Sequence, residues 1–190
     1  MFTIAFIHTK VNELVGRAIT SPITANKGAV GLLLETITGI PHSSNTLDCL
    51  DGELKVFPVK TLKNGTRVPK ETIAITMLNT EHLKTIPYSD SGVCKKLQRT
   101  LYVPYERSGD TIKYLTPTFI DMSLPQYATV CAAIQADYET IQQKYKTSGT
   151  LSSTDGVYLQ NRTKGPGGKE EKTRAFYLRK EFAKQHIPLT

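Results

Sequence analysis

The sequence predicts a mixed α/β fold, of the α/β or α+β class, with a central mixed sheet flanked by helices. Its 190 residues are close to one domain in length, and 39% hydrophobic residues are enough to fill one core. Segments with the apolar period of a helix stand at both ends of a run of strand-like segments. This order of elements favours a mixed sheet in a single domain covering residues 1–190.

Three helices are expected from apolar periodicity and end signals. The first follows Thr9, with an apolar stripe made of Val11, Leu14, Val15 and Ile19. The second covers residues 27–38 and stops at Gly39, ahead of Pro41. The third begins at Ser123 as the N-cap with Pro125 just inside, and it ends before Gly149.

Strands are expected between these helices and at the end of the chain. The first four cover residues 52–60, 72–78, 100–105 and 114–119. Two further apolar-aromatic runs, residues 157–159 and 175–178, flank the glycine-rich and charged stretch 161–173. This pattern predicts a hairpin with a long loop, and long loops inside compact domains are often functional.

The charge balance narrows the classes of partner. Lys and Arg number 24 against 17 Asp and Glu, so the net charge is +7 and favours nucleic acid or an anionic membrane surface. The sequence has no apolar run of about 20 residues, which excludes an integral membrane protein. A cytoplasmic location is expected, because the three cysteines are widely spaced and the first residues lack the features of a signal peptide.

The stretch from Asp48 to Val59 has the residues for metal-dependent phosphodiester cleavage. In a strand, Glu53 and Lys55 point to one face, and a turn could return Asp48 to Glu53. Two carboxylates make a hard oxygen site suited to Mg²⁺, and an adjacent ammonium can orient the attacking water. The alternative is an ordinary solvated polar face, and Glu35 on the preceding helix is equally open to that interpretation.

Four sequence blocks then carry a resemblance. They cover residues 27–35, residues 52–55 with 58 and 59, residues 93–104, and residues 156–162 with 176–180. In this order and spacing they resemble the MutH family of DNA endonucleases, which includes the mismatch-repair nicking enzyme and related GATC-cutting restriction enzymes. The resemblance implies a restriction-endonuclease-like fold.

The resemblance also implies an acid, acid, lysine core formed by Asp48, Glu53 and Lys55, with Glu35 as an extra carboxylate at the Mg²⁺ site. The first aspartate of the family lies two residues further from the E-x-K than Asp48 does. Asp51 is the competitor, but it is separated from Glu53 by Gly52 alone. Turn geometry favours Asp48.

Other matching positions take roles in binding DNA. Lys96 resembles a lysine near the scissile strand, and Lys27 one that contacts phosphate. Arg162 matches an arginine that reads a base edge, as a bidentate arginine does on guanine, and Tyr177 matches a tyrosine that senses adenine or its methyl group. Lys164 would add a phosphate contact. The alternatives are solvated lysines and a core tyrosine.

The sequence therefore predicts a type II restriction-like, Mg²⁺-dependent endonuclease that cuts double-stranded DNA at a short site, GATC by family analogy. Cutting both strands of a palindrome would require a homodimer. One alternative is a mismatch-repair nickase that acts with partner proteins. Another is a non-catalytic DNA-binding module of the same fold.

Overall fold

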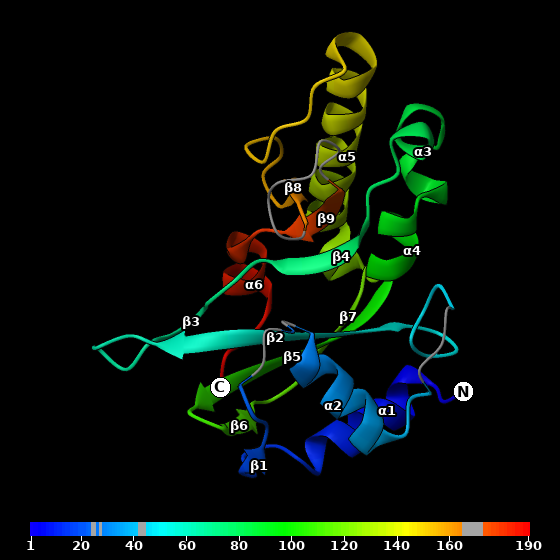
Figure 1. Ribbon diagram of the computed structural model, residues 1–190. Helices are drawn as coiled ribbons and strands as arrows, with labels where there is room; N and C mark the ends of the chain where they lie inside the picture. Colours follow the sequence, from blue (N-terminus) through cyan, green and yellow to red (C-terminus); the bar gives the residue numbers. More distant parts are fainter. Residues whose placement is uncertain (24–25, 27, 42–44, 165–172) are drawn as a thin grey trace. The chain divides into compact units, whose positions relative to one another are not determined.

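Two structural units, each built from separate stretches of chain, make up the computed structural model (Figure 1). The structure describes residues 1–190 except 24, 25, 27, 42–44 and 165–172. The first unit contains residues 1–71, 99–120 and 183–190, and the second contains residues 72–98 and 121–182. The single endonuclease domain expected over residues 1–190 stays a prediction.

The first unit is organised around a mixed sheet. Its strands are β1 (Ile19–Thr20), β2 (Glu53–Thr61), β3 (Arg67–Pro69), β5 (Arg99–Ser108), β6 (Thr111–Tyr114) and β7 (Thr118–Asp121), whose last residue passes into the second unit. The strand order is β1-β6-β5-β2-β3, with β7 also paired to β5. Strands β2 and β5 are parallel, whereas β2 with β3 and β5 with β6 are antiparallel, so the mixed sheet is confirmed.

Helices α1 (Ile4–Asn12) and α2 (Ala29–Thr38) pack on one face of this sheet. Leu54 and Val56 of β2 lie in the same core as Val30 and Leu34 of α2. Because side chains alternate along a strand, Glu53 and Lys55 take the opposite face. The predicted division of the two faces of β2 is confirmed.

The second unit combines a three-stranded antiparallel sheet with several helices. The strands, in the order β4-β9-β8, are β4 (Ile73–Met77), β9 (Arg174–Leu178) and β8 (Leu159–Thr163). The helices are α3 (Thr80–Thr85), α4 (Gly92–Leu97), α5 (Ala128–Ser148), the two 3₁₀ turns Tyr88–Asp90 and Pro125–Tyr127, and the start of α6 (Lys180–His186). Strands β8 and β9 confirm the predicted hairpin, although β8 runs on to Thr163, two residues beyond the expected start of the loop. Most of that loop lies outside the described residues.

Three expectations about elements are wrong. Helix α1 begins at Ile4 and not after Thr9, because the hydroxyl of Thr3 caps it, and Ile19 lies in a strand. The strand expected over residues 114–119 is divided between β6 and β7, since β6 forms a hairpin with β5 across Gly109. Ser123 does not cap the third helix; it bonds to Asp121, and the 3₁₀ turn at Pro125 precedes α5.

None of the helices within the described part of the chain has the length and apolar character needed to cross a membrane.

Candidate active site

The start of β2 carries the central pair of the candidate site. The Glu53 side chain is 1% exposed, and the Lys55 side chain is 17% exposed. The Lys55 ammonium lies 2.5 Å from Oε1 of Glu53. A buried carboxylate requires such a partner, because removing an ionised group from water is costly unless its charge is matched. The E-x-K segment is therefore a buried ion pair and not a solvated face.

The loop before β2 returns Asp48 to this pair. The backbone N–H of Asp48 donates to Oε2 of Glu53 at 3.3 Å, and the backbone N–H of Leu54 donates to Oδ2 of Asp48 at 3.0 Å. The turn is closed by a hydrogen bond from the Cys49 N–H to the Gly52 carbonyl at 3.0 Å. Asp48 is thus held beside the first residues of the strand.

Gly52 makes the tight passage from this loop into β2. A Cβ atom at this position would lie 2.9 Å from the carbonyl oxygen of Arg99 and 3.1 Å from Cβ of Ile4. The contact with the Arg99 carbonyl oxygen is shorter than real Cβ atoms make, and the one with Ile4 is tighter than most, so the neighbours would have to move. A residue without a side chain is therefore required immediately before Glu53.

Asp51 has a different set of contacts. Its Oδ1 accepts the N–H of Ile4 at 2.7 Å, at the first residue of α1. Its Oδ2 lies 2.7 Å from Nη1 of Arg99. Asp51 thus fastens the beginning of α1 to β5, and both of its oxygens are used in that contact.

The thiol of Cys49 lies among the negative charges of the site. Burial and the fields of four carboxylates raise the pKa of Cys49 to about 12. These carboxylates are, in decreasing order of effect, Asp48, Asp51, Glu53 and Glu35. Glu35 on α2 therefore belongs to the same acidic environment as the residues of β2. A thiol held protonated in this way is a poor nucleophile.

The oxygen donors of Asp48, Glu53 and Glu35 fit a hard divalent cation in their chemistry. In their present positions, however, no three His, Cys, Asp or Glu side chains of the described residues are gathered into a metal-binding group. The Lys55 ammonium takes up one oxygen of Glu53. Binding of Mg²⁺ would require these side chains to converge further.

Two polar residues beside the pair were missed by the sequence reasoning. In the parallel pairing of β2 with β5, Glu53 is opposite Thr100 and Lys55 is opposite Tyr102. Both partners are fully buried. Burial raises the pKa of Tyr102, which the hydrogen bond to Thr100 opposes. The alternation in Thr100-Leu101-Tyr102 was visible, but the register that places it beside Glu53 was not.

The remaining predicted residues lie in the second unit or outside the described residues. Lys96 is half-buried on α4, and its role at the scissile strand stays a prediction. Lys164 is exposed at the end of β8, where its N–H donates to the Thr173 carbonyl at 2.7 Å. Lys27 lies outside the described residues.

Arg162 and Tyr177 are brought together on neighbouring strands. The Arg162 guanidinium lies 5.9 Å from the centre of the Tyr177 ring, and its Nη1 donates to Oγ1 of Thr72 at 3.2 Å. Arg162 is exposed and Tyr177 is half-buried. The Arg162 guanidinium therefore makes a cation–π contact with the ring of Tyr177.

Asp137 of α5 fixes the strand that carries Arg162, and no sequence signal identified it. Its carboxylate accepts three consecutive backbone N–H groups, those of Val157, Tyr158 and Leu159, at 2.7, 2.7 and 2.8 Å. Asp137 is 6% exposed. A buried carboxylate at the entry to β8 thus sets the position of the hairpin strand.

Comparison with known proteins gives a family match for this chain. A family model described as "DNA mismatch repair enzyme MutH" matches residues 41–147, more than half of the chain. The matched part contains Asp48, Glu53, Lys55 and Lys96, whereas the blocks around residues 27–35 and 156–180 lie outside it.

Two curated relatives and one solved structure are also similar. The DNA mismatch repair protein MutH of Shewanella sp. (strain ANA-3) is 28% identical over 164 residues, 81% of this chain and 70% of the relative. That of strain MR-4 is 29% identical over 165 residues, with 80% and 70% covered. The complex of restriction endonuclease MvaI with its cognate DNA substrate is 10% identical, with a TM-score of 0.47, over 96% of this chain and 93% of that one. By the extent of the family match, the chain belongs to the MutH family.

Proposed function

We propose that the protein is a Mg²⁺-dependent endonuclease that hydrolyses phosphodiester bonds of double-stranded DNA at a short specific sequence. The observation that carries the proposal is the buried pair of Glu53 and Lys55, with Asp48 held against it by two hydrogen bonds. Membership of the MutH family supports it, because the curated relatives are named DNA mismatch repair proteins. The whole chain would act as one domain with a restriction-endonuclease-like fold.

Each residue of the site would have a distinct task. Asp48 and Glu53, with Glu35, would hold Mg²⁺, which supplies charge stabilisation at the phosphate and acidifies a water molecule. The Lys55 ammonium would hold and orient that water, and would balance charge that develops on the phosphate. Lys96 would hold phosphate near the cut. The contacts of Asp51 with Ile4 and Arg99 favour Asp48 as the first carboxylate.

Sequence readout would come from the β8–β9 hairpin. Arg162 is exposed, and its guanidinium lies over the ring of Tyr177 on the neighbouring strand. Arginine pairs bidentately with guanine, so GATC is the first sequence to test. Lys164 and Lys27 would contact phosphates, which position the duplex without reading it. A cytoplasmic location fits this function, because the three cysteines are free thiols.

Two modes of cutting fit this site. A type II restriction-like enzyme would cut both strands as a homodimer, whereas a mismatch-repair nickase would cut one strand with the help of partner proteins. Supercoiled plasmid with Mg²⁺ separates them: linear product from the purified protein alone supports the restriction-like mode, and open circles or no activity support the nickase. Run-off sequencing of digested genomic DNA, methylated and unmethylated, would give the site and its dependence on methylation.

Absence of cleavage of every plasmid and genomic DNA, with Mg²⁺ and with Mn²⁺ and also with mismatch-repair partner proteins added, would contradict the catalytic proposal. A non-catalytic DNA-binding module would then be the better description. That module would still bind duplex DNA through the hairpin, and substitution of Arg162 would weaken its binding.

A further inference from the structure

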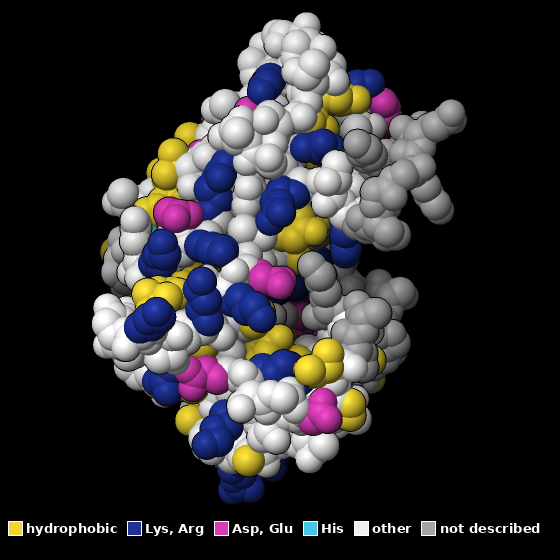
Figure 2. Space-filling model, turned by 60° about the vertical axis from the view of Figure 1, so that its left-hand side comes forward, with side chains coloured by type: hydrophobic (Ala, Val, Ile, Leu, Met, Phe, Trp, Pro, Cys, Tyr) yellow, Lys and Arg dark blue, Asp and Glu magenta, His cyan; other side chains and the backbone are white. Residues whose placement is uncertain are grey.

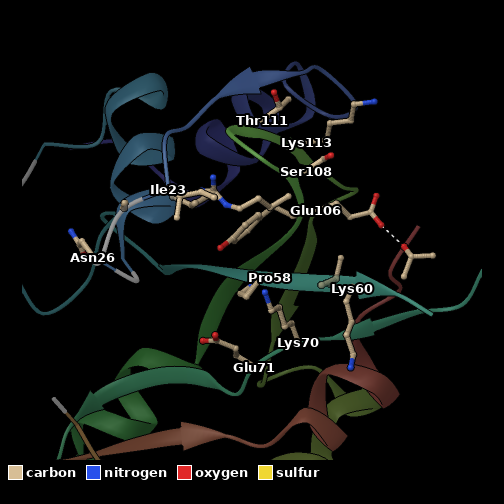
Figure 3. Close-up of a pocket in the computed structure, with 16 residues that line it drawn as sticks. Ile23, Asn26, Pro58, Lys60, Lys70, Glu71, Glu106, Ser108, Thr111 and Lys113 are labelled. Atoms are coloured by element: carbon tan, nitrogen blue, oxygen red, sulfur yellow. Dashed lines mark hydrogen bonds between the residues drawn. The ribbon is translucent and has the colours of Figure 1, made fainter. Parts of the chain in front are cut away.

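A cavity of about 630 Å³ lies within the first unit, at the carboxyl end of β2 (Figure 3). It is lined by the end of β2, the first residues of α2, the residues that follow β3, and the β5–β6 hairpin. We call it the β2 cavity. Small-molecule sites in proteins have volumes of about 300–1,000 Å³, so this cavity has the size for one. None of the described residues that line it belongs to the candidate active site.

Three side chains form a row across the sheet in the wall of this cavity. Pro58 of β2 is opposite Tyr105 of β5 in the parallel pairing. Lys70 follows β3 and comes opposite Pro58 on its other side, where the Lys70 N–H donates to the Pro58 carbonyl at 2.9 Å. Residues opposite one another share a face, and alternation along β2 gives this row the face of Leu54. The row therefore lies on the α1–α2 face of the sheet, opposite Glu53.

The row offers a ligand an apolar surface with one aromatic ring. Tyr105 is 8% exposed, and Val30 and Ile23 add aliphatic side chains to the lining. Burial raises the pKa of Tyr105, the nearby Arg107 opposes this effect, and Glu71 adds to it. The phenol is thus close to one cation and one acid of the same cavity. Planar rings stack on an aromatic surface of this kind.

Two of the charged groups in the lining are already occupied. Arg67 donates to Glu106 through Nε at 3.1 Å and Nη2 at 3.2 Å. The Arg107 guanidinium donates to Oγ of Ser21 at 3.0 Å. Neither Glu106 nor Arg107 can bind a ligand without giving up these contacts.

Lys70 and Glu71 remain available to a ligand. Both are exposed, and among the described residues neither the Lys70 ammonium nor the Glu71 carboxylate has a hydrogen-bond or ion-pair partner. In Figure 3 the Lys70 side chain points toward the middle of the lining residues, whereas the ammonium groups of Lys60 and Lys113 lie at the edge. The cavity thus presents one cation toward its middle and a carboxylate next to it in the chain.

These groups match the parts of a nucleotide. Lysine is a point charge that binds phosphate without a fixed geometry, so Lys70 suits the phosphate. Bases stack on aromatic side chains, and Tyr105 with Pro58 provides an apolar surface for one. A carboxylate accepts hydrogen bonds from the amino group of a base, as Glu and Asp do from cytosine, and this suits Glu71. An anion without a base would leave the last two contacts unused.

General attraction of anions does not identify such a site. The chain has a net charge of +7, and Figure 2 shows one face crowded with Lys and Arg side chains and with few acids among them. A surface of this kind raises the local concentration of any anion. Dependence of binding on both a phosphate and a base is therefore the property that distinguishes the β2 cavity from the rest of the surface.

We propose that the β2 cavity binds a free nucleoside monophosphate whose base carries an amino group. Lys70 holds the phosphate, Tyr105 and Pro58 contact the base, and Glu71 accepts a hydrogen bond from its amino group. This site is additional to the proposed endonuclease function, because its row of side chains faces away from the candidate active site and its ligand needs neither DNA nor a metal. The ligand would contact the first residues of α2, the helix that carries Glu35.

Isothermal titration calorimetry of the whole chain, in EDTA, tests the proposal with deoxycytidine monophosphate (dCMP) as the probe. Three other ligands each change one part of it. Deoxycytidine lacks the phosphate, deoxyribose phosphate lacks the base, and deoxyuridine monophosphate (dUMP) has an oxygen in place of the amino group. The variants are Lys70→Gln and Glu71→Gln. Lys63→Gln removes the charge of another exposed lysine in the first unit and serves as the control.

Wild type should bind dCMP about 10-fold more tightly than deoxycytidine or deoxyribose phosphate, because the loss of a contact with a charged group or of a stacked base has an effect of this size. Lys70→Gln should weaken binding of dCMP by about 10-fold, and Lys63→Gln should match wild type. Wild type should prefer dCMP to dUMP, and Glu71→Gln should lose that preference. Circular dichroism checks that each variant is folded.

Three results would overturn the proposal. One is the absence of dCMP binding by folded wild type. Another is equal binding of dCMP and deoxyribose phosphate, which would show general attraction of anions only. The third is a loss of duplex binding in Lys70→Gln by the same factor as the loss of dCMP binding, which would assign the cavity to DNA. Cleavage of plasmid is measured separately, so a failure of the endonuclease proposal would leave these binding results unaffected.

Discussion

The ammonium of Lys55 lies 2.5 Å from the carboxylate of Glu53, and both side chains project from the face of β2 opposite the α1–α2 core. This face is closed to solvent at Glu53, whose side chain is 1% exposed. A charged pair in such a place is not explained by stability, since hydrophobic residues of similar size are often at least as stabilising. The proposed catalytic chemistry, which needs both charges, would account for it.

Asp48 and Asp51 should separate activity from stability. Asp48→Asn should abolish cleavage, because it removes the charge of a proposed metal ligand, and should leave the melting temperature close to wild type. Asp51→Ala should retain cleavage and lower the unfolding free energy by about 1–2 kcal/mol, through loss of the α1 contact and of a partly exposed ion pair. Cleavage assays and chemical denaturation of both variants give the comparison. Loss of cleavage in Asp51→Ala, with cleavage retained in Asp48→Asn, would instead make Asp51 the first metal ligand.

Gly52 should tolerate no side chain. Gly52→Ala is expected to lower stability by about 1–3 kcal/mol and to reduce cleavage, because its Cβ would press on Arg99 and Ile4 and move Glu53. Gly31→Ala adds the same methyl group within α2, where the nearest atom is 4.0 Å away. That control should gain about 0.5–1 kcal/mol from the better helix propensity of alanine. Equal effects of the two substitutions in denaturation would argue against the close approach.

Asp137 should be important for the stability of the β8–β9 hairpin, although it lies at least 20 residues before the N–H groups that it accepts. Asp137→Ala leaves three N–H groups without their acceptor and is expected to cost about 3 kcal/mol. Glu139→Ala, at an exposed position of the same helix, should change stability by less than about 0.5 kcal/mol. Thermal denaturation compares them. A neutral Asp137→Ala would show that the amides find other acceptors.

Glu106 should make the free energy of unfolding depend on pH in the acidic range. Its pKa is lowered in the folded protein by the hydrogen bonds from Arg67 and Thr61, so the folded state binds the proton less readily than the unfolded state. The stabilisation is therefore present above the ordinary pKa of 4.5 and is lost as pH falls through the lower, folded value. Glu106→Gln should be destabilised by up to about 1 kcal/mol at pH 7, and the difference should shrink as the pH falls below 4.5. Denaturation at several pH values checks this, and a difference that grows in acid would contradict it.

Local signals predicted the parts of the fold that depend on neighbouring residues. The period of two placed Glu53 and Lys55 on one face of β2, and the glycine stop of α2 is observed at Gly39, with φ at +81°. The start of α1 has a local signal, the cap by Thr3, which the apolar stripe beginning at Val11 did not include, and a second support, Asp51, which lies 47 residues away from Ile4. No local pattern reports such a contact.

The candidate site shows the same division. The types of residue in the acid, acid, lysine group could be identified from the sequence, and the loop from Asp48 to Gly52 follows turn geometry. The contact of Asp51 with Arg99 and the position of Tyr102 beside Lys55 depend on the register of β2 with β5. Asp137 depends on how α5 meets the start of β8. Register and packing between distant segments are set by the whole fold.

The central claim is that the Glu53–Lys55 pair performs metal-dependent cleavage, and a plasmid assay of Lys55→Ala tests it most directly. The purified wild type should convert supercoiled DNA to cut forms with Mg²⁺ and lose that activity in EDTA. Lys55→Ala should be at least about 100-fold slower, because the loss of one charge-stabilising donor has effects of this size, while its circular dichroism spectrum stays that of wild type. Lys63→Ala, at an exposed turn residue after β2, should cut at the wild-type rate. Full cleavage by a correctly folded Lys55→Ala would contradict the account.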